Sequence, residues 1–400
     1  MSTNGAQPGF SPPAYPFDRL VPLAQRASAH AGGMVDLSVG TPCDPPPKAV
    51  VDALASSGAE RGYPPGVGSA RLLDAGRSWI ERRFGVRLQR FEIAACVGTK
   101  ELVAGIPHWL RLRDPARDVV LYPAVSYPTY AMGALLAGAR PVPVPVREDG
   151  SLALECISSD DAKRALCLWV NSPSNPTGAL DDLGAAAAWG RAHQVLVFSD
   201  ECYAEFTWQG APQTILEHGL DGLVAVHSIS KRSNAAGLRC GLYAGDPEIV
   251  HYLSELRRHA GFMVPGPVQL AAAVALEDDA HVARQRERYR ARLESFAALL
   301  GEVGVAAQLP GGGFYLWVRT EVAALQALSA PGGVELTETT SAAWRFTEAL
   351  AEQAGTLVSP GDFYGPSIED RVRIALVQPE ERLALTRARL ARLDLVRAGS

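Results

Sequence analysis

A lysine that follows two serines and precedes an arginine is the first group of residues that could do chemistry. Ser228, Ser230 and Lys231 come directly after an apolar segment, and Arg239 lies eight residues beyond the lysine. Arginine binds a phosphate through paired hydrogen bonds, and lysine can form a Schiff base with an aldehyde. The chain has only four lysines, at positions 48, 100, 163 and 231. The pattern indicates a phosphate beside an amine nucleophile, although a solvated lysine after a strand would give the same spacing.

Two further groups of polar residues follow apolar, strand-like segments. Asp200 comes directly after Val195–Ser199, and Asn175 lies in the proline-containing turn that follows Leu166–Val170. A carboxylate at a strand end could pair with a protonated ring nitrogen, and an asparagine amide could donate to a phenolate oxygen. Taken alone, Asp200 also fits a helix N-cap and the asparagine turn also fits a purely structural role.

The segment Gly98-Thr99-Lys100 has the features of a helix start that could bind an anion. Glycine followed by a helix leaves free backbone N–H groups at the helix N-terminus. An ordinary glycine-led helix start is the alternative. The segment is not GxxxxGK[ST], and no GxGxxG follows a strand. These absences disfavour a nucleotide-binding site.

A series of short apolar segments, alternating with helical stretches, must position these residues. Short runs bounded by turn residues predict strands. The predicted strands are Asp118–Tyr122, Arg140–Val146, Leu166–Val170, Val195–Ser199, Leu223–His227 and Gly241–Ala244. Strands separated by helices indicate a mostly parallel sheet, whose ligands bind beyond the carboxyl ends of the strands.

A second structural unit is predicted towards the C-terminus, and residues 1–35 suggest an arm with a short helix. The apolar spacing predicts a long helix over Val282–Val303, and its arginines at every second position suggest a solvated face. The other predicted elements are a strand at Phe314–Arg319, a loop at Ala330–Thr340, a helix at Ala342–Ala354, a strand at Val372–Leu376 and a terminal helix.

Composition narrows the classes of protein. The 400 residues are 47% hydrophobic and 20% charged, with a formal net charge of −5. This is typical of a globular enzyme and gives no electrostatic reason to bind nucleic acid or an anionic membrane. The uncharged run Val119–Ala139 contains prolines and polar residues, so we interpret it as strand, loop and helix. The polar N-terminus resembles no secretory signal, and six cysteines without CxxC spacing suggest a reducing, cytoplasmic location.

Taken together, the motifs resemble those of a known enzyme family. In chain order they are Gly98-Thr99-Lys100, Asn175-Pro176-Thr177-Gly178, Asp200-x-x-Tyr203, Ser228-x-Ser230-Lys231 with Arg239, and Arg373. This set resembles the fold-type I pyridoxal-phosphate aminotransferases of class I/II, and the similarity runs from about Leu37 to Leu376. The resemblance implies an α/β fold with a mostly parallel seven-stranded sheet in a large domain and a smaller α+β domain. Residues 1–47 would form an arm and part of the small domain, 48–285 the large cofactor-binding domain, and 286–400 the small C-terminal domain.

The resemblance also implies a role for each residue that binds the cofactor, pyridoxal 5′-phosphate. Lys231 would be the catalytic residue and would hold the cofactor covalently. Asp200 would keep the ring nitrogen protonated, Asn175 and Tyr203 would bond the ring oxygen, and Tyr127 would stack on the ring. The phosphate would be held by the hydroxyl groups, guanidinium and backbone N–H groups of Ser228, Ser230, Arg239, Thr99 and Lys100.

Substrate and subunit contacts follow from the same resemblance. Arg373 would bind the substrate α-carboxylate, with Arg371 as a competing candidate because it lies two residues away on the same strand. The backbone of Gly40 would lie against that carboxylate, and Asn175 would also contact the substrate. Tyr63 would reach the phosphate of the neighbouring subunit in a homodimer. No metal is implied.

Proton transfer imposes a further requirement on Lys231. A lysine amine with an ordinary pKa of about 10.4 is charged at neutral pH and cannot accept a proton. Its pKa must therefore be lowered for it to act as a base. A desolvated site beside Arg239 is expected to lower it.

Longer segments indicate a particular branch of the family. They are similar to the succinyldiaminopimelate aminotransferases of actinobacteria, which would give N-succinyl-2-amino-6-oxopimelate as substrate, glutamate as amino donor and lysine biosynthesis as context. These segments are Asp36–Pro42, Asn171–Gly178, Ser199–Tyr203, Met263–Pro265 and Ser359–Gly365. Two departures are the length of Thr320–Thr340 and Leu238, where an aromatic residue is expected. The alternatives are an aminotransferase for another amino acid in specialised metabolism, and a pyridoxal-phosphate lyase or synthase.

Overall fold

The large sheet brings the predicted site segments together. The computed structural model describes residues 10–302, 304–320 and 341–398. The sheet has seven strands in the order β2-β8-β7-β6-β5-β3-β4. Their bounds are β2 (Ile93–Cys96), β3 (Val119–Pro123), β4 (Arg140–Val144), β5 (Ala165–Asn171), β6 (Leu196–Asp200), β7 (Leu223–Ser228) and β8 (Gly241–Gly245). Strands β3 to β7 run parallel to one another, which confirms the expected mostly parallel sheet.

Two features of this sheet differ from the sequence prediction. The strand β2 was not predicted, because Ile93–Cys96 is only four residues long and contains two alanines, which have low strand propensity. Its burial on both faces comes from tertiary packing rather than from its own sequence. The strand β8 was predicted at Gly241–Ala244, and it pairs antiparallel with both β2 and β7.

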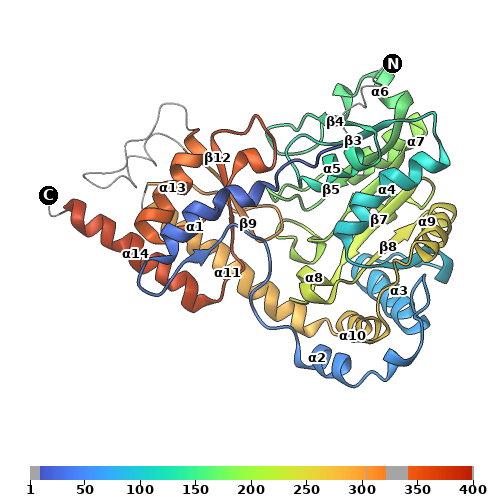
Figure 1. Cartoon of the computed structure of the whole chain (residues 1–400), viewed down its shortest axis with the longest axis horizontal. Helices are drawn as coiled ribbons and strands as arrows, with labels where there is room; N and C mark the ends of the chain where they lie inside the picture. Colours follow the sequence, from blue (N-terminus) through green and yellow to red (C-terminus); the bar gives the residue numbers. More distant parts are fainter. Residues whose placement is uncertain (1–9, 303, 321–340, 399–400) are drawn as a thin grey trace, which may run out of the picture.

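Helices cover both faces of the large sheet (Figure 1). One apolar core joins the sheet to α3 (Ala70–Phe84), α7 (Leu183–His193) and α10 (Gly266–Glu277). The other joins it to α4 (Thr99–Arg113), α5 (Thr129–Leu136) and α9 (Pro247–His259). Successive strand residues alternate between these two cores, as the period of two requires. The remaining helices of this part are α2 (Lys48–Ala55), α6 (Ser159–Arg164) and α8 (Ile229–Arg232).

A smaller antiparallel sheet lies beside the large one, at the left of Figure 1. It has the order β11 (Ser359–Pro360), β12 (Arg371–Ala375) and β9 (Tyr315–Arg319). The N-terminal strand β1 (Val35–Asp36) pairs in parallel with β10 (Thr356–Leu357), so the N-terminal segment lies with the C-terminal part of the chain. The helices here are α1 (Val21–Ser28), α11 (Ala280–Glu302), α13 (Ala342–Ala354) and α14 (Glu380–Ala398). The domain limits given above stay predictions, and the expected loop at Ala330–Thr340 lies outside the described residues.

Short 3-10 helices connect several of these elements. They are η1 (Pro16–Leu20), η2 (Ala59–Arg61), η3 (Arg90–Glu92), η4 (Leu154–Cys156), η5 (Ala204–Phe206), η6 (Ile215–His218), η7 (Ala236–Leu238) and η8 (Gly361–Phe363). The expected arm and short helix of residues 1–35 correspond to η1 and α1 over the described part of that segment.

The expectation of a solvated arginine face on α11 is partly wrong. Arg292 is buried, and its two terminal nitrogens donate to the carboxylate oxygens of Asp44 at 2.6 and 2.9 Å. Arg286 donates to the backbone carbonyls of Glu205 and Thr207. The arginines at 284, 288 and 290 are exposed as expected. Long-range partners, which spacing along one helix does not reveal, decide which arginines are buried.

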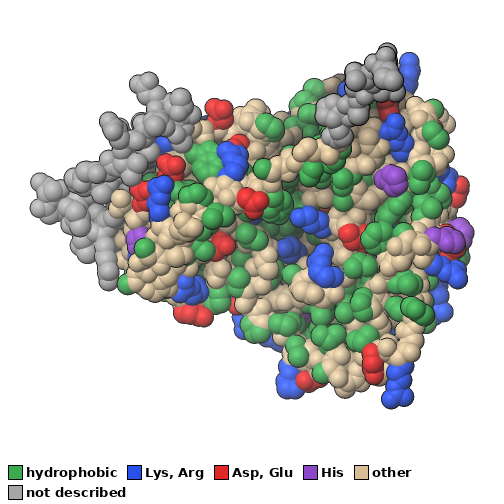
Figure 2. Space-filling view, viewed as in Figure 1, with side chains coloured by type: hydrophobic (Ala, Val, Ile, Leu, Met, Phe, Trp, Pro, Cys, Tyr) green, Lys and Arg blue, Asp and Glu red, His purple; other side chains and the backbone are tan. Residues whose placement is uncertain are grey.

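The described surface has no large region of a single charge on the face drawn in Figure 2. Basic and acidic side chains are interspersed over the face drawn in Figure 2. Among the described helices, none is both long enough and apolar enough to cross a membrane. Residues Val119–Ala139, the uncharged run, form β3, a loop and α5, as interpreted from the sequence.

Candidate active site

A cavity of about 550 Å³ lies where β5, β6 and β7 end. It brings together predicted residues from segments that are far apart in the chain. The predicted residues that line it are Gly40, Thr99, Lys100, Tyr127, Asn175, Asp200, Tyr203, Ser228, Ser230, Lys231, Arg239 and Arg373. The cavity is therefore lined by two amines, a buried carboxylate, a group of hydroxyls and two guanidinium groups.

The parallel register of the sheet explains why these residues meet. Asn171 is the last residue of β5 and pairs with Asp200, the last residue of β6, while Ser228 ends the adjacent strand β7. The amide of Asn171 donates to the backbone carbonyl of Asp200 at 2.8 Å, and its side-chain oxygen accepts from the backbone N–H of Asn175 at 2.8 Å. Asn171 thus fixes the turn that presents Asn175 to the cavity.

Lys231 is held at the end of β7 by the short helix α8. The hydroxyl of Ser228 caps this helix by accepting from the backbone N–H of Ser230 at 3.1 Å. The amine of Lys231 donates to the backbone carbonyl of Gly40. Burial lowers the pKa of the amine to about 8, with Arg373 and Arg239 adding to the effect. The prediction of a desolvated lysine beside Arg239 agrees with this, although burial is the larger cause.

The low pKa of Lys231 predicts unusual reactivity in the cofactor-free protein. Acylation requires the neutral amine, so the labelling rate rises as pH passes through the pKa. Lys231 should reach half-maximal labelling near pH 8, well below the ordinary lysine value of about 10.4. Mass spectrometry of labelled peptides resolves all four lysines in one sample. A labelling midpoint for Lys231 near the ordinary lysine value of about 10.4 would contradict the prediction.

Asp200 is a buried carboxylate with two donors. The hydroxyl of Tyr130 donates to it at 2.9 Å, and the backbone N–H of Cys202 donates at 3.2 Å. Burial raises the pKa of Asp200. Tyr130 was not predicted as a site residue. Its spacing from Tyr127 was a usable signal, because the turn that leads into α5 lets the backbone N–H of Tyr130 donate to the carbonyl of Tyr127 at 3.2 Å and brings the two ring centroids to 6.1 Å.

One end of the cavity is shaped to accept an anion. Gly98 precedes α4 with φ +76°, and a Cβ at this position would lie 2.2 Å from a terminal nitrogen of Arg239. Only glycine fits there, because the guanidinium lies directly against the backbone. The first backbone N–H groups of α4, at Thr99 and Lys100, open at the same place. Helix N–H groups, a guanidinium and the hydroxyls of Ser228 and Ser230 together match a phosphate group.

Another part of the cavity lining is Arg373 on β12. Its guanidinium donates to the side-chain oxygen of Asn175 at 2.7 Å and to the backbone carbonyl of Ser38 at 2.5 Å. It also lies over the rings of Tyr315 and Tyr364, at 4.2 and 4.7 Å from their centroids. Arg371, the competing candidate, is half-buried and is not among the residues that line the cavity.

Three aromatic contacts were not foreseen from the sequence. The hydroxyl of Tyr203 forms a hydrogen bond with that of Tyr315 at 2.7 Å, so it has a protein partner in addition to its predicted role. A Cβ on Gly40 would lie 2.0 Å from the Tyr315 hydroxyl, which explains the glycine. The ammonium of Lys100 lies 5.1 Å from the ring centroid of Tyr15 and 5.9 Å from that of Tyr127. Pairing of β9 with β12 brings Tyr315 here, and no local motif marks it.

Tyr63 is the one predicted site residue that does not line this cavity. Its side chain is 96% exposed. The expectation that it reaches the site of a neighbouring subunit stays a prediction.

Comparison with known proteins gives one consistent family. The family model for aminotransferase class I and II matches residues 32–388. The chain is 40% identical over 386 residues to the 4-dedimethylamino-4-oxo-anhydrotetracycline transaminase OxyQ of Streptomyces rimosus, covering 94% of this chain and 99% of that protein. It is 41% identical over 404 residues to the probable aminotransferase Rv1178 of Mycobacterium tuberculosis, covering 98% and 89%.

A solved structure agrees with these matches. The probable N-succinyldiaminopimelate aminotransferase of Thermus thermophilus superimposes with a TM-score of 0.80 at 30% identity, covering 94% of this chain and 99% of that one. The similarity extends over almost the whole length of each protein. The chain therefore belongs to the class I and II aminotransferase family.

Proposed function

We propose that this aminotransferase takes an amino group from glutamate and delivers it to a 2-oxo acid, with Lys231 as the catalytic residue. The observation that carries the proposal is the pair of cations, Arg373 and Lys100, in the cavity that also contains Lys231. Glutamate has two carboxylates and 2-oxoglutarate, its product, keeps both. Two cationic groups in one cavity suit such a dicarboxylate.

Class I and II aminotransferases use pyridoxal 5′-phosphate, and the residues of the cavity fit this cofactor. The cradle between Gly98 and Arg239 suits its phosphate, and the buried Asp200 suits its protonated ring nitrogen. When bound, the cofactor supplies an aldehyde that links to amines and a ring that withdraws electrons from the α-carbon.

Each side chain in the proposal has a separate task. Ser228, Ser230, Arg239 and the backbone N–H groups of Thr99 and Lys100 hold the phosphate. Asp200 keeps the ring nitrogen protonated, and Tyr127 packs on the ring. Asn175 directs its amide at the ring oxygen, since its own side-chain oxygen already accepts from Arg373. Tyr203 donates to the same ring oxygen while its hydroxyl accepts from Tyr315.

Lys231 moves the proton that the reaction requires. Its amine takes a proton from the substrate α-carbon and returns it at the neighbouring cofactor carbon. Only the neutral amine can accept a proton, and burial lowers its pKa to about 8, so a substantial fraction is neutral at cytoplasmic pH. The rate of this step should therefore rise with pH through about 8.

The substrate is bound through its charged ends. Arg373 pairs with the α-carboxylate, and the backbone of Gly40 lies against it. Lys100 pairs with the distal carboxylate of glutamate, since the aromatic rings of Tyr15 and Tyr127 flank its ammonium without neutralising it. Tyr63 of a second subunit completes the phosphate site in a homodimer.

The second substrate in the proposal is N-succinyl-2-amino-6-oxopimelate. The similarity to the Thermus thermophilus protein named as a probable N-succinyldiaminopimelate aminotransferase supports it. A larger carbonyl substrate from specialised metabolism is the second candidate. It is favoured by the 40% identity to OxyQ, whose name gives an anhydrotetracycline derivative as its substrate.

A panel of amino donors with 2-oxoglutarate tests the proposal. The purified enzyme with bound cofactor should convert fully to its aminated form with glutamate alone. Among donors, succinyldiaminopimelate should then give the highest kcat/KM. The Lys100→Ala variant should raise KM for glutamate by about tenfold but leave KM for alanine unchanged, because a charged hydrogen bond contributes about 1.5–3 kcal/mol. Release of ammonia and pyruvate from a donor would instead identify a lyase.

A further inference from the structure

A buried ion pair lies directly beside Lys231 and has no role in the proposed function. Arg232 follows Lys231 in the chain and is 2% exposed, and Glu205 is 6% exposed. The Nε of Arg232 donates to Oε1 of Glu205 at 3.2 Å. Two buried charges require an explanation, because desolvating them costs several kcal/mol per ion.

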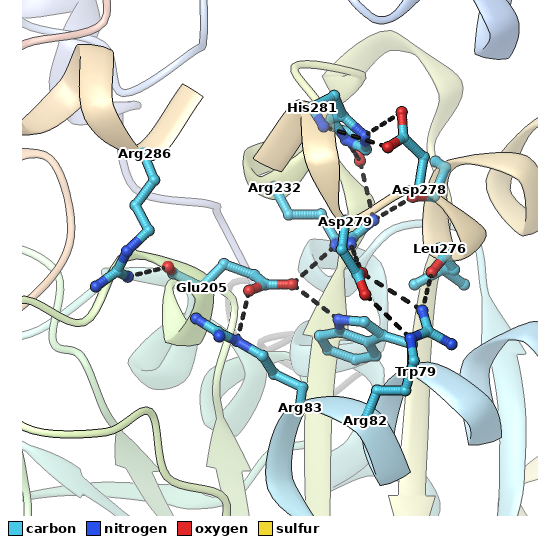
Figure 3. Close-up of polar contacts among 12 residues, drawn as sticks. Trp79, Arg82, Arg83, Glu205, Arg232, Leu276, Asp278, Asp279, His281 and Arg286 are labelled. Atoms are coloured by element: carbon cyan, nitrogen blue, oxygen red, sulfur yellow. Dashed lines mark hydrogen bonds and ion pairs between the residues drawn. The ribbon is translucent and has the colours of Figure 1, made fainter. Parts of the chain in front are cut away.

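Both members of the pair have further partners, shown in Figure 3. Oε1 of Glu205 also accepts from the indole N–H of Trp79 at 2.8 Å, and Oε2 lies 2.7 Å from Nε of Arg83. Arg232 also donates to the backbone carbonyl of Ala275. These bonds give a fixed geometry rather than a large gain in stability, since apolar pairs often replace buried ion pairs at no cost.

The Glu205–Arg232 pair joins the segment that carries Lys231 to the segment that carries Asp200 and Tyr203. Arg232 belongs to α8, a helix of four residues that also carries Lys231. Such a short helix has no stability of its own, so tertiary contacts must fix its backbone. Glu205 belongs to η5, directly after the turn that carries Asp200 and Tyr203. In the same network, Arg286 of α11 donates to the backbone carbonyl of Glu205.

We propose that Glu205 and Arg232 are a positioning pair. The pair fixes helix α8, which carries Lys231, relative to the segment that runs from Asp200 at the end of β6 to Glu205 in η5. The planar guanidinium sets direction as well as distance, because its donors point along fixed axes. The inference rests on the proposed role of Lys231. Without the pair, helix α8 loses its ionic link to η5 and keeps only its cap, its packing and contacts such as that of Ser233 with His281, and the amine of Lys231 moves towards solvent.

The test compares two double variants that make the same substitutions. Arg232→Met with Glu205→Gln removes the buried pair, while the glutamine still accepts from Trp79. Arg71→Met with Glu277→Gln removes an exposed pair of 3.2 Å between α3 and α10, and serves as the control. The single variant Glu205→Gln is measured as well, because it removes the negative charge, and with it the ion pair, while the glutamine can still accept from Trp79.

The first measurement is acylation of the lysines in the cofactor-free full chain. Losing the buried pair should raise the labelling midpoint of Lys231 by about one pH unit, because burial is the main cause of its low value. Lys48 is the internal reference, and the control double variant should match the wild type. An unchanged midpoint for Lys231 in both pair variants would overturn the inference.

The second measurement is the single-turnover rate with glutamate, per bound cofactor. This rate should fall at least about tenfold in the Arg232→Met/Glu205→Gln and Glu205→Gln variants, because misplacing a catalytic group by about 1 Å can cost 100-fold. KM for glutamate should stay unchanged, because the groups that bind glutamate are not altered. A purely structural role would lower the melting temperature without changing this rate, and would contradict the inference. If the wild type itself fails to react with any amino donor, the proposed function is wrong, and the labelling midpoint still decides the positioning role.

Discussion

Replacing Lys231 with alanine should remove the visible absorbance of the bound cofactor and lower turnover by at least about 1,000-fold. Both effects follow from one side chain, because in the proposed function the same amine holds the cofactor covalently and moves the proton. General acid–base catalysis alone contributes about 100- to 10,000-fold, and the covalent link adds to this. The measurement is the absorbance spectrum after incubation with pyridoxal phosphate, together with kcat for glutamate and 2-oxoglutarate.

No other lysine should replace Lys231. Lys100 lines the same cavity, but the pKa of its amine is raised, chiefly through Tyr127 and Tyr15 against the opposing effect of burial, so it stays charged and is a poor nucleophile. Lys163→Ala, in the helix α6, serves as the control and should match the wild type. Wild-type turnover in Lys231→Ala, or a wild-type protein that stays colourless with the cofactor, would refute the assignment.

The sequence was informative wherever a functional residue follows a strand. Asn171, Asp200 and Ser228 each end an apolar run, and the rule that ligands bind beyond the carboxyl ends of parallel strands was enough to group them. The glycine at position 98 was assigned to an anion site from its place before a helix. The structure adds the reason for it, namely the close approach of Arg239.

The sequence was uninformative wherever a residue acts through a distant partner. Tyr315 contacts Tyr203 and Arg373 only because β9 pairs with β12, and this pairing has no local signature. The burial of Glu205 and Arg232 likewise arises where α3, η5 and α8 meet. The pattern of one sequence predicts the apolar face of a single helix or strand and the position of its turns. Contacts between different helices and strands have to come from the structure.

Arg373→Lys should lower kcat/KM for every amino donor by about 100-fold while the cofactor stays bound to Lys231. The guanidinium lies over the rings of Tyr315 and Tyr364, and hydrogen bonds to Asn175 and Ser38 fix its rotation. This leaves its remaining N–H groups to bind a carboxylate in a set direction. A lysine keeps the charge but loses the planar fork, and a charged hydrogen bond contributes about 1.5–3 kcal/mol.

The neighbouring arginine on β12 provides the matched control for this prediction. Arg371→Lys changes the same residue type two positions away, at a side chain that does not line the cavity. It should leave kcat/KM unchanged for all donors. The effect of Arg373→Lys should fall on both kcat and KM, since the α-carboxylate is bonded to the reacting carbon and a misplaced carboxylate also misplaces the bond that reacts. A loss in Arg371→Lys with none in Arg373→Lys would transfer the carboxylate site to Arg371 and overturn the present assignment.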